Sequence, residues 1–315
     1  MSAVRPLRDL RRADEGRFGG KSAGLGELLA AGVRVPPGFA LATDEPPREE
    51  IEDAYRELAA AAGEPDPPVA VRSSAIGEDS ESATFAGQQE TVLWVRGVDA
   101  VCAAVDRCRA SLYSPEAVAY REHLGGGGEP AMGVAVQLMV DAAVSGVLFT
   151  CNPVTGDPSV VAINASWGLG AAIVGGEVTP DDYLVSKVTG EVVREQLGDK
   201  RLEYVPAQTG VAVREVPPER AAARCLAPED LSELVAVARA AERHFGAHQD
   251  IEWAIARDTA WGPDFVGHVA DKVTPGGGVF VVQSRPVTTL PTREVEPAAS
   301  AISLVMAQFG AARKK

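Results

Sequence analysis

The sequence is poor in residues that mark several common protein classes. Its 315 residues include four cysteines and four histidines, and aromatic residues make up 5% of the chain. The cysteines form no C-x-x-C pair, and together with the histidines they give no zinc-ligand spacing, so we expect no zinc site. We expect the cysteines to be free thiols in a reducing cytosol.

Positive charge is also scarce. The chain has 30 Lys and Arg against 44 Asp and Glu, a formal net charge of -14. Binding nucleic acid requires a basic face, so no nucleic-acid partner is expected. No run of about 18 apolar residues could span a bilayer, and no membrane partner is expected. The first residues, MSAVRPLRDLRRADEG, lack the apolar core of a secretory signal, which favours a cytoplasmic location.

The chain does have apolar residues in plenty, and 46% of it is hydrophobic. At this length it can bury a large core and is expected to form two lobes. Leucines recur at helical spacing within residues 19–32, which Gly32 closes. Further helices are expected at 48–62 and 99–123, and strands in PPGFAL and PPVAVRSSA.

From residue 132 the pattern changes to closely spaced apolar strands. MGVAVQLMV, SGVLFT and VVAINA are joined by turn residues, as in an antiparallel sheet. A helix with an apolar stripe is expected at 228–245, with Pro228 in its first turn. Two strands, DIEWAIA and GVFVVQSRPV, flank a polar, glycine-rich stretch at 257–278. The expected fold class is therefore α+β.

A lysine follows two glycines in RFGGKSAGLGEL. The segment looks like the end of a Walker A loop, but Gly16 and Gly20 enclose three residues where that motif needs four. Glycines allow close backbone approach, and a helix N-terminus attracts anions. Lys21 is therefore a candidate phosphate ligand, with a solvated surface lysine as the alternative.

Two further segments suggest phosphate binding. Arg72 ends a predicted strand and precedes two serines, and a fixed guanidinium can hold phosphate oxygens in pairs. An ordinary ion pair is the alternative. TFAGQQET, residues 84–91, places small and hydroxyl residues around Gly87 and could lay backbone N–H groups over a polyphosphate. A simple hairpin turn would have the same composition.

The last two predicted strands carry polar residues where a core strand would not. Glu252 lies in QDIEW, and Gln283 and Arg285 share one face of their strand because side chains alternate. Carboxylate and amide oxygens suit Mg²⁺ held together with substrate phosphates. The alternative is a polar sheet face turned to solvent.

Together these segments resemble the ATP-binding domain of the phosphoenolpyruvate synthase and pyruvate phosphate dikinase family, which rifampin phosphotransferases share. The resemblance runs from about residue 10 to 290, in the family's order. The matching motifs are GGKSAGLGEL, PPGFAL, VAVRSSAIGEDSESATFAGQQET, VQLMVDAAVSGVLFT, NASWGLG, TPDDYLV, DIEWAI and VVQSRPV.

The resemblance implies an ATP-grasp-like fold with the nucleotide in a cleft between two lobes. These would be residues 1–140 and 141–290, followed by a tail or linker remnant at 291–315. It implies catalytic, phosphate-binding roles for Lys21, Arg72 and Arg285, and magnesium ligation by Glu252 and Gln283. The full set of nucleotide-binding residues that it implies is Lys21, Arg72, Gly87, Thr91, Gln137, Glu252, Gln283 and Arg285.

The implied activity uses ATP and Mg²⁺ to pyrophosphorylate a histidine on a separate swivelling domain, leaving AMP and phosphate. None of the four histidines here lies in the family's glycine-rich Thr/Ser-His acceptor motif. We therefore expect a partner protein that carries the histidine, as for the stand-alone subunit of phenylphosphate synthase, or else a fragment of a longer chain. The final small-molecule acceptor is not indicated.

The sequence departs from the family pattern in ways that keep two alternatives open. Ala171 stands where a glutamate usually follows GLG, and the stretch between PPGFAL and VAVRSS is shorter than in large relatives. The stretch between Glu252 and Gln283 is longer. A nucleotide-binding regulatory or scaffold module without activity is one alternative. An ATP-grasp ligase that forms ADP is the other.

Overall fold

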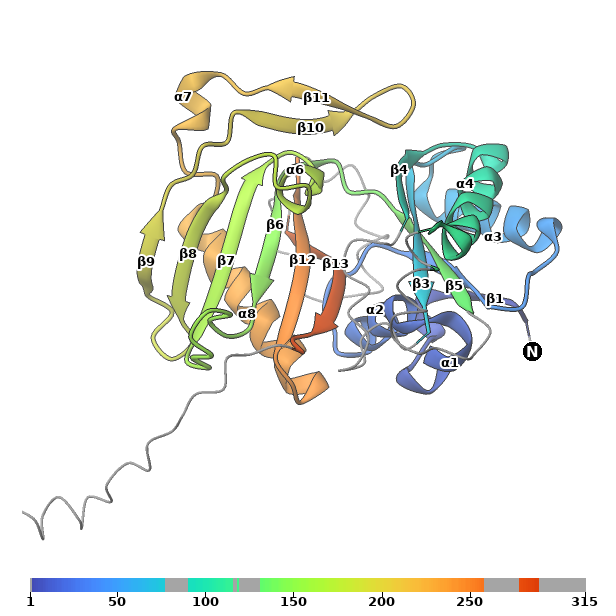
Figure 1. The fold of residues 1–315 in the computed structure, drawn as a ribbon, viewed down its shortest axis with the longest axis horizontal. Helices are drawn as coiled ribbons and strands as arrows, with labels where there is room; N and C mark the ends of the chain where they lie inside the picture. Colours follow the sequence, from blue (N-terminus) through green and yellow to red (C-terminus); the bar gives the residue numbers. More distant parts are fainter. Residues whose placement is uncertain (1, 77–89, 116–117, 119–130, 258–277, 289–315) are drawn as a thin grey trace, which may run out of the picture.

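The computed structural model describes residues 2–76, 90–115, 118, 131–257 and 278–288. Two antiparallel sheets form its frame (Figure 1). The smaller sheet has the strand order β1 (Val4–Pro6), β2 (Gly38–Leu41), β5 (Met132–Leu138), β3 (Val69–Ala75), β4 (Thr91–Val95). The larger has the order β13 (Val279–Pro286), β12 (Gln249–Ala256), β6 (Ala142–Phe149), β7 (Val160–Trp167), β8 (Asp181–Ser186), β9 (Val192–Gln196).

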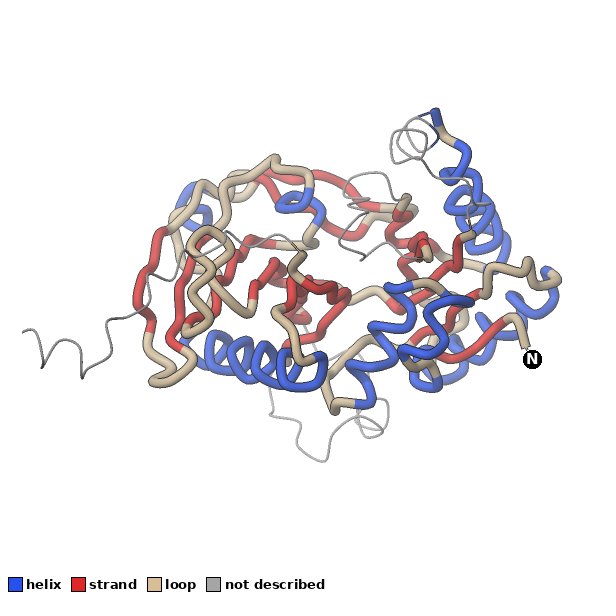
Figure 2. Tube along the Cα trace, turned by 60° about the horizontal axis from the view of Figure 1, so that its bottom comes forward, coloured by secondary structure: helices blue, strands red, loops and turns tan. Residues whose placement is uncertain are grey.

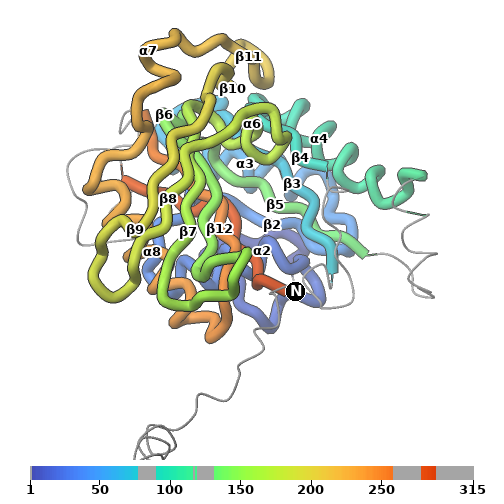
Figure 3. Tube along the Cα trace, turned by 60° about the vertical axis from the view of Figure 1, so that its left-hand side comes forward, coloured from blue at the N-terminus to red at the C-terminus, as the bar shows by residue number. Residues whose placement is uncertain are grey.

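Helices cover the outer faces of these sheets. α3 (Arg48–Ala62) and α4 (Val98–Ala110) pack on the smaller sheet, and α8 (Pro228–Phe245) lies along one face of the larger sheet (Figure 2). The short helices are α1 (Glu15–Phe18), α2 (Gly20–Ala30), α6 (Ala171–Val174) and α7 (Pro218–Ala221). A separate hairpin, β10 (Leu202–Pro206) and β11 (Val211–Glu215), lies above the larger sheet (Figure 3).

The alternation of side chains along β12 explains how the larger sheet divides its residues between two environments. Ile251, Trp253 and Ile255 point to the core that α8 covers. Glu252 and Ala254 therefore face the opposite side, toward the smaller sheet. A single strand thus supplies both core residues and candidate site residues.

Helix α2 comes from the first part of the chain but packs into the core of the larger sheet. Leu25 and Leu28 are buried in one cluster with Leu234 of α8 and Val281 of β13. This packing fixes the start of α2, where Lys21 lies, against β13. The hydrophobic core therefore does not divide where the chain passes from one sheet to the other.

The predicted mixture of helices and strands is confirmed. The helix predicted at 99–123 is interrupted: α4 ends at Ala110, a 3₁₀ turn follows at Ser111–Tyr113, and residues 116–117 and 119–123 lie outside the described residues. Ser114 is extended, with φ −61° and ψ 150°. Pro115 follows it, and a residue before proline avoids the helical conformation. No helix among the described residues is long and apolar enough to cross a bilayer.

Several predicted features lie outside the described residues. They are Gly87 with most of the segment 84–91, nearly all of the polar stretch 257–278, and the tail 291–315. The four cysteines are described, and all are buried free thiols.

Candidate functional site

A cleft of about 690 Å³ lies between the two sheets. It is lined from one side by β3, β4, β5 and the start of α2, and from the other by β6, β12, β13 and α6. Its residues separate by chemistry into a charged end and an apolar end. The charged end consists of Lys21, Arg72, Thr91, Gln137, Glu252, Gln283 and Arg285. Every described residue that the sequence nominated for nucleotide binding therefore lines this one cleft.

Arg72 connects the two sheets at the charged end. Its Nη1 donates weak hydrogen bonds to Glu252 Oε2 at 3.4 Å and to Gln283 Oε1 at 3.3 Å. The Arg72 side chain is 13% exposed, and its buried Nε has no hydrogen-bond partner among the described residues. A buried guanidinium with long bonds and spare donors can turn to phosphate oxygens at little cost.

Lys21 lies at the start of α2, with the side chain buried against β3. Its Nζ donates to the Ser73 backbone oxygen at 3.1 Å, and the residue is 9% exposed. Gly19, with φ +80°, approaches the Ser74 backbone so closely that a Cβ there would overlap the Ser74 oxygen. Gly19 thus allows close packing of the start of α2 on β3, which brings the Lys21 ammonium group into the cleft.

Strand pairing brings Glu252 and Gln283 together. The two residues lie directly opposite each other on β12 and β13. Next along the pair, Trp253 lies opposite Val281, so Val282 is an extra residue in β13 and forms a bulge. Because of this bulge, Val282 and Gln283 both line the cleft. The two side-chain oxygens then converge on the same nitrogen of Arg72.

Asp250 is a functional candidate that the sequence reasoning missed. It lies opposite Arg285 and accepts hydrogen bonds from its Nε at 2.8 Å and Nη2 at 2.7 Å. Burial raises the pKa of Asp250, an effect that the neighbouring Arg285 opposes. Asp250 therefore holds the Arg285 guanidinium at the cleft. The available signal was its position two residues before Glu252, which puts both carboxylates on one face of β12.

Thr91 and Gln137 complete the wall made by the smaller sheet. Thr91 begins β4 and lies directly opposite Arg72. Gln137 is 1% exposed, and its Nε2 donates to the Pro36 backbone oxygen at 3.3 Å. Gln137 lies near the end of β5, next to Leu138 and Met139, which also line the cleft.

The apolar end is walled by aliphatic side chains and by α6. Leu93 and Met139 come from the smaller-sheet side, and Leu169 and Ala254 come from the larger. Ala171, at the position where the resemblance led us to expect a glutamate, lines this wall as the first residue of α6. The wall is thus apolar at a position that could have carried a carboxylate.

The described residues contain no group of three or more His, Cys, Asp or Glu side chains that could hold a metal by themselves. Mg²⁺ does not require one, because it commonly binds one or two carboxylates and completes its shell with waters and substrate phosphates. Glu252 and Gln283 present two oxygens to one point in the cleft. This donor set fits a magnesium ion that arrives with a polyphosphate.

Comparison with known proteins identifies the family. Residues 44–304 match the family described as "Pyruvate phosphate dikinase, AMP/ATP-binding domain". The chain belongs to this family. The probable phosphoenolpyruvate synthase of Methanothermobacter thermautotrophicus is 36% identical over 90% of this chain and 45% of its own length. The phosphoenolpyruvate synthase of Pyrococcus furiosus is 41% identical over 77% of this chain and 28% of its own.

The family resemblance predicted from the motifs is therefore confirmed. The chain spans less than half the length of both relatives. Most of the cleft residues lie within the range matched to the AMP/ATP-binding domain, whereas Lys21 precedes it. A solved structure, PH1788 from Pyrococcus horikoshii, aligns over 89% of this chain and 95% of its own, with a TM-score of 0.43 and 11% identity. That likeness is too low to support a fold argument.

Proposed function

We propose that this chain is the ATP-binding part of a dikinase-type phosphotransferase. It binds ATP with Mg²⁺ in the cleft and transfers a pyrophosphoryl group to a histidine on a separate swivelling domain or partner protein. Water then releases the outer phosphate, so that AMP, phosphate and a phosphohistidine remain. Residues 1–140 and 141–290 act as the two lobes of an ATP-grasp-like fold, although α2 shares the core of the second lobe.

The observation that carries the proposal is the convergence of charged groups in one cleft of an AMP/ATP-binding domain. Arg72, on β3, meets Glu252 and Gln283, which follow it by 180 and 211 residues. Lys21 and the Asp250–Arg285 pair approach the same cleft. A purely structural role does not account for so many charged side chains beside an apolar pocket. Phosphoryl transfer needs this kind of charge stabilisation and positioning more than a protein nucleophile.

The roles of the residues follow from their chemistry. Arg72 and Arg285 bind and orient the phosphate oxygens in pairs, and Lys21 adds a point charge. Gly87 and Thr91, which begins β4, act in covering the triphosphate, and Gln137 contacts the nucleotide near the lobe junction. Glu252 and Gln283 hold the magnesium ion, which supplies charge neutralisation on the phosphates when bound. The apolar end receives the base.

The acceptor must come from outside the described part of the chain. Neither His244 nor His248 lines the cleft. Each is engaged elsewhere, His244 with Glu27 at 2.6 Å and His248 with Glu242 at 2.7 Å. The relatives are more than twice as long as the segment they share with this chain, which leaves room for a histidine-bearing domain.

Product analysis tests the proposal. The purified chain is incubated with ATP and Mg²⁺, with and without a histidine-bearing domain from a full-length family member. We expect AMP, phosphate and an acid-labile phosphohistidine only when that domain is present. Formation of ADP without AMP would contradict the dikinase mechanism and favour the ligase alternative.

A second candidate function rests on Ala171. Its methyl group lines the cleft where the family usually places a carboxylate. The chain could then bind ATP as a regulatory or scaffold module without turning it over. ATP binding measured by calorimetry, with no product from any histidine-bearing domain of the family, is the result that would favour this alternative.

A further inference from the structure

The β10–β11 hairpin reaches from the larger sheet across to the smaller one. Its base is continuous with α7 on the larger-sheet side, and its tip lies near β4 (Figures 1 and 3). It belongs to neither main sheet. A two-stranded hairpin alone is marginally stable in water, so its contacts decide where it lies.

The base of the hairpin is held by ion pairs to a buried carboxylate. Glu203 is fully buried, and its Oε1 accepts hydrogen bonds from Arg214 Nη2 at 2.7 Å and Arg220 Nη1 at 2.8 Å. Arg220 lies over the ring of Trp167 at 4.4 Å, and its backbone oxygen accepts from the Trp167 indole. This end of the hairpin is therefore fastened to the end of β7.

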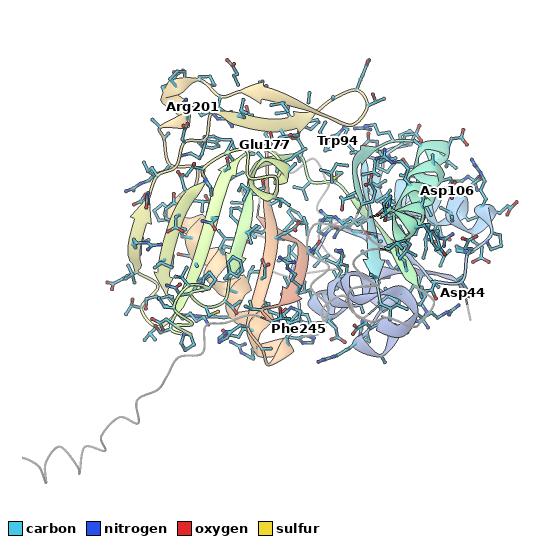
Figure 4. All side chains as sticks on the ribbon, viewed as in Figure 1. Asp44, Trp94, Asp106, Glu177, Arg201 and Phe245 are labelled. Atoms are coloured by element: carbon cyan, nitrogen blue, oxygen red, sulfur yellow. The ribbon has the colours of Figure 1, made fainter. Side chains whose placement is uncertain are left out.

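The middle of the hairpin holds one wall of the cleft. The Tyr204 backbone oxygen accepts from Leu169 N at 2.9 Å. The Tyr204 hydroxyl donates to Glu177 Oε1 at 2.8 Å, just beyond α6 (Figure 4). Tyr204 is thus hydrogen-bonded to both ends of the segment from Leu169 to Glu177, which includes α6 and lines the cleft.

The tip of the hairpin touches the opposite wall. Gly210 N donates to the Trp94 backbone oxygen at 3.3 Å. Trp94 has φ +57°, a left-handed conformation that is costly for a bulky residue, at an irregularity in the β3–β4 pairing (Figure 4). Leu93, Tyr204 and half-buried Val211 pack in the same apolar cluster as Trp94 and Leu169. Leu93 and Leu169 line the cleft from its two sides.

We propose that the β10–β11 hairpin, residues 202–215, is a strap that ties the two walls at the apolar end of the nucleotide cleft. The strap retains bound nucleotide, and its tip releases from Trp94 when nucleotide enters or leaves. The tip is the end that opens because, among the described residues, one hydrogen bond of 3.3 Å and apolar contacts join it to the cluster that contains Trp94. The base is held by two arginines paired with the buried Glu203. This inference rests on the proposed placement of the nucleotide in this cleft.

A matched pair of substitutions on β11 tests the strap. Val211→Asp puts a carboxylate into the apolar cluster that contains Trp94, whereas Val213→Asp adds the same group two residues away at a 51% exposed position. Neither residue lines the cleft. In stopped-flow release of a fluorescent ATP analogue from the Mg²⁺ complex, Val211→Asp should speed dissociation about tenfold, the effect of losing about 1.4 kcal/mol. Val213→Asp should stay within about twofold of the unsubstituted chain.

Hydrogen exchange in the nucleotide-free chain keeps the two proposals distinguishable. With the tip detached, Val211→Asp should expose residues 91–95 and speed their amide exchange, and Val213→Asp should not. If the unsubstituted chain binds no nucleotide, the proposed function fails and the exchange result still decides the tip contact. If nucleotide binds but both substitutions leave release and exchange unchanged, the strap is wrong and the proposed function stands.

Discussion

The two ends of the cleft are built on different principles. The charged end consists of polar side chains that come from segments far apart in the sequence and meet across the cleft, as Arg72 meets Glu252 and Gln283. The apolar end consists of aliphatic side chains such as Leu93 and Leu169, which pack in a common cluster under the hairpin strap. The first end depends on a few directional contacts, and the second depends on buried area.

This difference predicts different consequences of damage. Loss of one directional contact at the charged end removes stabilisation that is needed where charge develops, so turnover should fall steeply. Loss of one aliphatic contact at the apolar end should weaken retention of the nucleotide and leave the chemical step nearly intact. Substitutions at the two ends should therefore separate into effects on turnover and effects on binding.

The largest effect is expected at Arg72. Arg72→Ala removes a side chain that contacts both Glu252 and Gln283, and turnover of ATP to AMP should fall by about 10²–10³-fold. Arg72→Lys is the matched variant, because it keeps the charge but not the paired donors, and should recover little of the rate. Circular dichroism checks that both variants fold. Turnover by Arg72→Ala within a few-fold of the unsubstituted rate would contradict the role assigned to the charged end.

A smaller effect is expected at Glu252. Glu252→Gln keeps the shape but removes the charge, and the apparent affinity for Mg²⁺ in the ATP reaction should fall by about tenfold to a hundredfold. The measurement is turnover as a function of Mg²⁺ concentration at fixed ATP. Glu229→Gln, an exposed position on α8, is the matched control and should leave the curve unchanged. An unaltered Mg²⁺ dependence in Glu252→Gln would remove this residue from the metal site.

The sequence was most informative where a short segment carries both structure and chemistry. Lys21 after its glycines, Arg72 at the end of β3, and the alternation around Glu252 and Gln283 could all be recognised locally. The structure places them in one cleft. Their common location depended on the family resemblance, because no local pattern states which strands become neighbours.

The features that escaped prediction depend on contacts between distant residues. The pairing of Asp250 with Arg285 follows from the register of β12 and β13. The bulge at Val282 adds a residue to β13, and no local sequence pattern predicts it. The hairpin strap was missed because β10 and β11 are short, β11 is largely exposed, and both have weak hydrophobic alternation. The break in the helix predicted at 99–123 falls just before Pro115, because the residue that precedes a proline avoids the helical conformation and Ser114 is extended.

The base of the strap is an exception to the contrast between the two ends of the cleft, because the ion pairs of Glu203 lie beside the apolar end. Burial alone would raise the pKa of Glu203, but the hydrogen bonds from Arg214 and Arg220 outweigh it and the pKa lies below its usual value. Such a carboxylate stabilises the fold above the unfolded-state pKa of about 4.3 and loses this effect as the pH falls through the lower folded-state pKa.

Glu203→Gln should therefore lower the free energy of unfolding at pH 7 by about 1–2 kcal/mol, a modest value because Arg214 is half exposed. The difference from the unsubstituted chain should shrink below about pH 4. Thermal unfolding of both chains across this range provides the measurement. Glu215→Gln, exposed at the end of β11, serves as the control. A difference that stayed constant with pH would mean that the charge of Glu203 does not hold the base.

The smallest effect is expected at Ala171, where the resemblance led us to expect a glutamate. Ala171→Glu places a carboxylate in the cleft wall at the start of α6, where it can accept one hydrogen bond from bound nucleotide. One such bond is worth about 0.5–1.5 kcal/mol, so nucleotide affinity should rise about threefold. Calorimetric titration with ATP and Mg²⁺ measures this affinity. Ala172→Glu is the control, because Ala172 is buried but does not line the cleft. It should destabilise the fold without any gain in nucleotide affinity. Weaker nucleotide binding by Ala171→Glu would contradict this expectation. It would show that the apolar end of the cleft requires an apolar side chain at this position, whereas the charged end requires polar ones.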